Sequence, residues 1–110
     1  MRALVLGVDG AVAYSTFTAV DDIERHVDGA LEELALEGDC VLLFNDDGLM
    51  RGLARNDVAT ALVLGTGAGY SDEDVIVGDA VVVTRGDSGF GDVGDGALAL
   101  LDRLGLPAPA

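Results

Sequence analysis

One stretch of the sequence does most to limit the fold. Residues 75–84 read VIVGDAVVVT, an almost unbroken run of Val and Ile. β-Branched residues favour strands, and a continuous apolar run is typical of a strand covered on both faces. The run therefore predicts a central strand in a sheet that is packed on both sides. Gly78-Asp79 interrupts it, which we interpret as a bulge.

The other elements follow from turn and capping signals. Two runs of strand formers, 2–8 and 11–18, flank Asp9-Gly10, a residue pair that favours hairpin turns. We expect loops at 65–74 and 85–96. Helices are predicted at roughly 21–28, with Asp21 as cap and Gly29 as stop, from Asn56 to Gly65, and from about 95 to 104.

The segment 30–36, ALEELAL, is ambiguous from its residues alone. Ala, Leu and Glu are strong helix formers, so propensity leans slightly to helix. Alternatively, Gly29 ends the preceding helix and 30–36 is a strand that pairs with CVLLFN at 40–45 across a short turn.

Three stretches resemble a small family catalogued as a domain of unknown function, found in phages, plasmids and salt-loving archaea. They are DIERHVDGALEELALEGDCVLLFNDDG, NDDGLMRGLARN and DVIVGDAVVV, and the resemblance covers about residues 20–84. The chain departs from the family at Ala54, where Pro usually follows Gly-Leu. The resemblance implies that 30–36 is a strand, which we adopt, and it implies no activity.

The length of 110 residues suits one domain with one core. We predict a single α+β domain over 1–110, with a frayed tail at 105–110. The expected sheet is mixed, with about five strands, and the element order is β-β-α-β-β-α-β-α.

The charge balance is the strongest functional signal. There are 20 acidic residues against six basic ones, all Arg, for a formal charge of −14. Concentrated salt screens the repulsion between carboxylates, so this composition is typical of proteins from salt-loving cells. The alternative is a DNA mimic, whose carboxylates imitate phosphates.

Several classes of partner are disfavoured. The few Arg are scattered, so we expect no direct nucleic-acid binding. No stretch reaches 18 apolar residues, and the first strand does not resemble a signal peptide, so we expect a cytoplasmic protein without a membrane span. Cys40 stands alone in an apolar run, which excludes an internal disulfide and favours a buried side chain.

Motifs that suggest a cofactor are weak. The NDDG segment at 45–48 has no distal Glu to complete a calcium loop, so we interpret it as a turn after a strand. GTGAGY at 65–70 follows a predicted helix, where a dinucleotide site needs a strand. His26 has no partner in the sequence. We therefore predict no catalytic residue, metal site or cofactor.

Arg51, Arg55 and Asn56 form the one candidate binding site. Two of the six Arg lie four positions apart, and they would share a face if the segment were helical. Arg binds carboxylate or phosphate with two parallel hydrogen bonds. The simpler interpretation is an ion pair with Asp46, Asp47 or Asp57; the functional one is contact with an anion or partner.

These observations favour a non-enzymatic accessory or interaction protein of a salt-loving archaeon or its virus or plasmid. Its partner would be an unidentified protein, and a homodimer is an open alternative. The second hypothesis is an acidic DNA-mimic inhibitor of a defence or DNA-binding protein. The third is a small anionic-ligand or enzyme site at residues 51–56.

Overall fold

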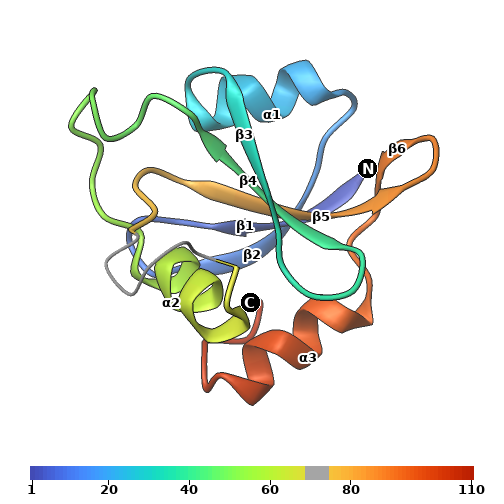
Figure 1. Cartoon of the computed structure of the whole chain (residues 1–110). Helices are drawn as coiled ribbons and strands as arrows, with labels where there is room; N and C mark the ends of the chain where they lie inside the picture. Colours follow the sequence, from blue (N-terminus) through green and yellow to red (C-terminus); the bar gives the residue numbers. More distant parts are fainter. Residues whose placement is uncertain (69–74) are drawn as a thin grey trace.

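The computed structural model describes residues 1–68 and 75–110. A single sheet lies between helices, with α1 on one side and α2 and α3 on the other (Figure 1). The helices are α1 (Val20–Val27), α2 (Asp57–Thr66) and α3 (Asp95–Arg103). The strands are β1 (Arg2–Leu6), β2 (Val12–Thr16), β3 (Leu31–Ala35), β4 (Cys40–Asn45), β5 (Ala80–Gly86) and β6 (Gly89–Gly91).

The sheet has the order β2-β1-β5-β4-β3, and β6 pairs with β5. Every strand pair is antiparallel, so the predicted mixed sheet was wrong. The reason lies in the long connection through α2. Its two ends meet, because the Asn56 N–H donates to the carbonyl of Ile76 at 2.8 Å. The chain thus returns to the end of the sheet that it left, and β5 runs opposite to β4.

The predicted element order lacked one strand. The segment 85–96 was expected to be a loop, but β5 continues to Gly86 and forms a hairpin with β6. Two of the three β6 residues are glycines, which are poor strand formers, so the sequence pattern concealed the strand. The order is therefore β-β-α-β-β-α-β-β-α.

The ambiguous segment 30–36 contains strand β3, which pairs with β4 along its whole length. The helix before it ends at Val27, and the left-handed C-cap is Asp28, with a φ of 63°, and not the predicted Gly29. Gly38 supplies a positive φ in the turn between the two strands. The strand that the family resemblance implied is confirmed, and local helix propensity is overridden by pairing.

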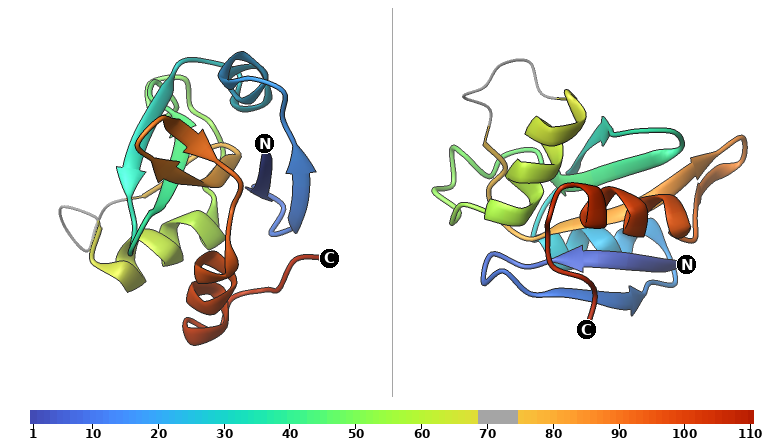
Figure 2. Two further views of the ribbon diagram at one scale, coloured as in Figure 1. Left: turned by 90° about the vertical axis from the view of Figure 1, so that its right-hand side faces the viewer. Right: turned by 90° about the horizontal axis from the view of Figure 1, so that it is seen from below.

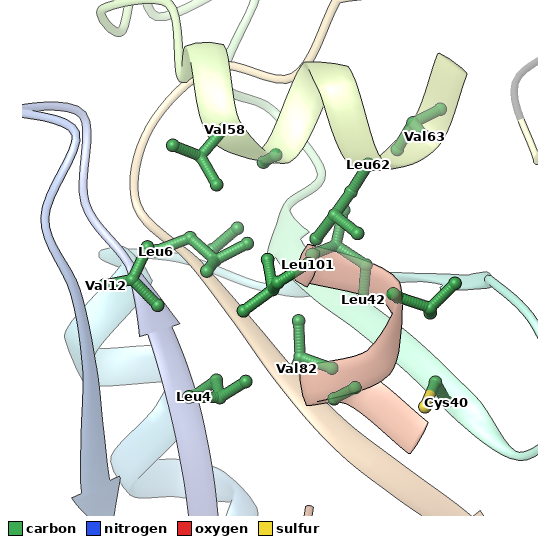
Figure 3. Packing of buried hydrophobic residues seen from close by; sticks show 14 of the residues in the cluster. Leu4, Leu6, Val12, Cys40, Leu42, Val58, Leu62, Val63, Val82 and Leu101 are labelled. Atoms are coloured by element: carbon green, nitrogen blue, oxygen red, sulfur yellow. The ribbon is translucent and has the colours of Figure 1, made fainter. Parts of the chain in front are cut away.

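Two apolar clusters cover the two faces of the sheet. Alternate residues of β5 point to opposite sides, Val81 and Val83 to the α1 side and Ala80 and Val82 to the α2 and α3 side. The central, doubly covered strand is confirmed, but it begins at Ala80 and not at residue 75. Val77 forms only an isolated bridge with Arg55, and Gly78 has a left-handed φ of 79°, so the interpretation of Gly78-Asp79 as a bulge within the strand was wrong. Figure 2 shows the helices from two further directions, and Figure 3 shows the larger cluster beneath α2 and α3. Labelled members include Leu4, Leu6, Leu42, Val58, Leu62, Val82 and Leu101.

Helix caps explain most differences at the element ends. The carboxylate that caps the start of α1 belongs to Asp22 and not to the predicted Asp21. It accepts the N–H groups of Thr18 and Ala19, both at 3.1 Å. α2 begins after Asn56 as predicted, but its last residue is Thr66 and its left-handed C-cap is Gly67, not Gly65. The expected loop at 65–74 lies partly outside the described residues.

The C-terminal residues run back toward β2. The Leu106 N–H donates to the carbonyl of Leu101 at 2.9 Å, and the Ala110 N–H donates to that of Val12 at 2.9 Å. Together with α3 and Tyr14, this segment lines a mainly apolar pocket of about 430 Å³ that is open to solvent.

Candidate functional site

Asn56 is the most deeply engaged of the three predicted site residues. Its side chain is fully buried and makes three hydrogen bonds. The amide nitrogen donates to the carbonyls of Leu6 at 2.8 Å and Gly78 at 2.9 Å. The amide oxygen accepts the Ala59 N–H at 3.0 Å, as an N-cap does. Asn56 thus joins α2, the end of β1 and the segment before β5, and its amide faces the interior.

Arg51 lies on the loop between β4 and α2 and reaches across to the end of α1. Its guanidinium donates to the Asp28 carboxylate at 2.6 Å and also to the Asp28 carbonyl. A cation near a helix C-terminus is favourable because the last carbonyls are unpaired there. The pair ties the loop to α1. Asp28 lies 23 residues away in sequence, and sequence proximity pointed instead to Asp46, Asp47 or Asp57.

Arg55 makes the local ion pair that the sequence suggested. Its Nε donates to the carboxylate of Asp57 at 2.8 Å, and both side chains are exposed. Its backbone forms an isolated β-bridge with Val77. Residues 46–52 form successive turns and not a helix, so Arg51 and Arg55 do not share a helical face. Each guanidinium instead contacts a carboxylate of its own.

Asn45 was not identified as a structural residue from the sequence. It is buried at the end of β4, and its amide nitrogen donates to the carbonyls of Val27 and Asp28, both at 3.0 Å. Its oxygen accepts the Asp47 N–H at 2.8 Å, which confirms the turn predicted at NDDG. A Cβ on Gly29 would lie 2.6 Å from the Asn45 nitrogen, so only glycine fits there without a shift.

Backbone hydrogen bonds fix the conformation of the loop 46–53. The Arg51 N–H donates to Asp47, Gly52 to Leu49, and Leu53 to Gly48, over 3.0 to 3.2 Å. The Leu53 side chain closes the base of the loop against Gly48 and Gly78, where a Cβ on Gly78 would come within 2.9 Å of it. The loop stands out from the body of the protein between β4 and α2 (Figure 1).

The tip of this loop carries two apolar side chains in water. Met50 is 89 % exposed and Leu49 is 68 % exposed, whereas Val8, the next most exposed large apolar residue among those described, is 43 % exposed. We call Leu49 and Met50 the apolar tip. An apolar composition raises no specific signal in a sequence rich in Leu, so only the fold revealed that these two side chains are outside.

The other ionisable groups of the described residues lie apart or pair locally. Nε2 of His26 lies 3.6 Å from the Asp79 carboxylate, and the Phe17 ring packs edge-on against the imidazole. Asp79 also accepts the Val8 N–H at 3.0 Å. Burial raises the pKa of the Cys40 thiol, which disfavours a reactive thiolate. Over residues 1–68 and 75–110, no group of three or more His, Cys, Asp or Glu side chains could hold a metal ion.

The chain matches the model of the family described as domain of unknown function (DUF3846) over residues 1–104. Curated proteins and solved structures give no match. Among the described residues, no helix has the length and apolar character needed to cross a membrane.

Proposed function

This chain belongs to the DUF3846 family of domains of unknown function, and we propose that it is a non-enzymatic interaction protein that binds a protein partner through its apolar tip. The observation that carries the proposal is the exposure of Leu49 and Met50 on a fixed loop. Burying a Leu or Met side chain is worth roughly 1.5–3 kcal/mol each. Two such side chains are enough for the centre of a small interface, where a few residues supply most of the affinity.

The loop is well suited to docking because it is already ordered. Ordering a flexible segment on binding lowers affinity, whereas a segment fixed in advance avoids that cost. Here backbone hydrogen bonds within 47–53 fix the loop, the amide of Asn45 holds its beginning, and the Arg51 guanidinium donates to the Asp28 carbonyl on the far side. Leu53 packs at its base. In this proposal Arg51 positions the tip.

The acidic composition agrees with apolar docking in concentrated salt. Salt screens exposed ion pairs, but it does not weaken the burial of apolar surface. Exposed acids occur on both sides of the sheet, at Asp21 on α1 and at Asp57 and Asp102 on α2 and α3. This spread favours adaptation to salt over a DNA mimic, which needs carboxylates gathered in rows on one face. We propose that the protein works in a salt-loving archaeon or its mobile element.

An anion site at Arg51, Arg55 and Asn56 has less support. Both guanidinium groups contact carboxylates of the same chain, so an anion would have to displace Asp28 or Asp57. The Asn56 amide donates to two main-chain carbonyls in the interior.

The test compares three forms of the tagged protein in extracts of its native cells at the cells' own salt concentration. The forms are wild type, the double variant Leu49→Ser/Met50→Ser, and Leu64→Ser, a change of the same kind on the exposed side of α2. Captured proteins are quantified by mass spectrometry. We expect one partner that wild type and Leu64→Ser retain and the double variant loses. Sedimentation of the purified forms shows whether that partner is a second copy.

Because the tip is exposed, the double variant should keep its stability within about 0.5 kcal/mol of wild type. An unchanged circular dichroism spectrum and unfolding curve therefore separate loss of docking from loss of fold. Equal capture of all partners by the double variant and by Leu64→Ser would contradict the proposal.

A further inference from the structure

Met50 is also the most accessible sulfur of the described chain. Its side chain lies at the end of the apolar tip, 89 % exposed. The sequence has three sulfur atoms in all, in Met1, Met50 and Cys40. Oxidation of sulfur in a folded protein follows access and, for a thiol, the thiolate fraction. The surroundings of the three sulfur atoms therefore predict the order of their oxidation rates.

The other two sulfur atoms are sheltered. Met1 is partly buried against the cluster beneath α1, and its amino group donates to the Phe17 carbonyl at 2.8 Å. Cys40 is 4 % exposed, on the opposite face of the sheet. Desolvation, with Asp39 and Glu37 nearby, raises the pKa of its thiol and keeps the thiolate scarce at neutral pH.

From this geometry we infer that Met50 is a reversible oxidation site by which a peroxide turns the apolar tip into a polar one. One peroxide oxygen is transferred to the Met50 sulfur as the O–O bond breaks. The sulfur loses two electrons and becomes a sulfoxide, and the second peroxide oxygen leaves as water or as an alcohol after taking up a proton. Methionine sulfoxide reductases reverse the change: two thiols supply two electrons and become a disulfide, and the sulfoxide oxygen leaves as water.

The sulfoxide alters the one property on which docking depends. It replaces a flexible apolar side chain with a polar one at the end of the tip. Met50 makes no contact that the fold requires, since its side chain lies almost entirely in water. Oxidation should therefore change the surface and leave the fold intact. The regulatory consequence rests on the proposed function, whereas the selective oxidation does not.

The first measurement is the rate of oxidation at each sulfur. The whole protein is treated with hydrogen peroxide at high salt, and the modified peptides are quantified by mass spectrometry over time. Met50 sulfoxide should form at least about tenfold faster than Met1 sulfoxide or any Cys40 product, because access sets the rate. In concentrated urea the two methionines should react at similar rates. Equal rates in the folded protein would overturn the inference.

The second measurement reports the surface without any partner. Oxidised wild type should elute earlier than untreated protein from a phenyl-agarose column in a descending ammonium sulfate gradient. Treatment with both methionine sulfoxide reductases and dithiothreitol as the thiol reductant should restore its retention. Met50→Leu has nearly the same volume and no sulfur, so peroxide should leave its retention unchanged. A shift of equal size in Met50→Leu, or none in wild type, would overturn the inference even if docking through the tip is real.

Discussion

Replacement of Asn56 by Ala is the sharpest test of how the candidate site is built. The substitution removes two hydrogen bonds donated to the carbonyls of Leu6 and Gly78 and one accepted from the Ala59 N–H. These bonds join three segments that are far apart in sequence. Because the Asn56 side chain is fully buried, water cannot replace the lost partners without entering the core.

The expected loss of stability is the sum of the costs of the hydrogen bonds that the substitution removes. Loss of an N-cap costs about 1 kcal/mol. Each buried carbonyl left without its partner costs roughly 1–3 kcal/mol. We therefore expect Asn56→Ala to lower the free energy of unfolding by about 3 kcal/mol or more. A domain of this kind has about 5–15 kcal/mol of stability in all, so the variant should still fold.

The measurement is urea unfolding at constant high salt, followed by circular dichroism. Asn56→Asp separates the two roles, because Asp caps helices as well as Asn does but, when ionised, cannot donate to the carbonyls of Leu6 and Gly78. We expect Asn56→Asp to be no more stable than Asn56→Ala. A loss below about 1 kcal/mol in Asn56→Ala, or recovery to wild type in Asn56→Asp, would show that the Asn56 amide does not hold the three segments together.

Three further predictions concern Gly29 between α1 and β3, the effect of pH, and the effect of salt. Gly29→Ala places a Cβ 2.6 Å from the Asn45 amide and should lower the free energy of unfolding by about 1–3 kcal/mol, whereas Gly91→Ala meets no atom within 4 Å and should be tolerated. A hydrogen bond from Arg85 holds the pKa of Glu33 below its usual value, so this pair stabilises the fold at neutral pH and the contribution is lost as pH falls through the lowered pKa. Glu33→Gln should therefore lose less stability than wild type on acidification. The free energy of unfolding in urea is measured at several acidic pH values for both proteins. An equal loss in the two would count against a contribution from the pair. With a formal charge of −14, the melting temperature should fall as salt is removed, and a rise in dilute buffer would contradict adaptation to salt.

Local signals in the sequence were sufficient for much of the fold. The Asn56 cap, the hairpin at Asp9-Gly10 and the central Val-rich strand each rest on short-range physics, and the structure has all three. The capping role of Asn56 was visible in the sequence. Its burial was not, because that depends on where β1 and the segment before β5 come to lie.

What the sequence concealed depends on contacts between distant residues. The direction of β5 follows from the meeting of Asn56 and Ile76. β6 forms because β5 offers it a partner, although its glycines carry no strand signal. Arg51 finds Asp28 only after α1 and the loop are brought together. The exposure of Met50 is likewise a property of the folded loop.

The most direct test of docking through the apolar tip is a ratio of two dissociation constants for the purified partner. One is measured with Leu49→Ser/Met50→Ser and the other with Leu64→Ser, by calorimetry at the salt concentration of the native cells. Loss of two buried apolar side chains predicts a ratio of at least about tenfold, since 1.4 kcal/mol corresponds to a factor of ten. Equal dissociation constants for the two variants would contradict the account.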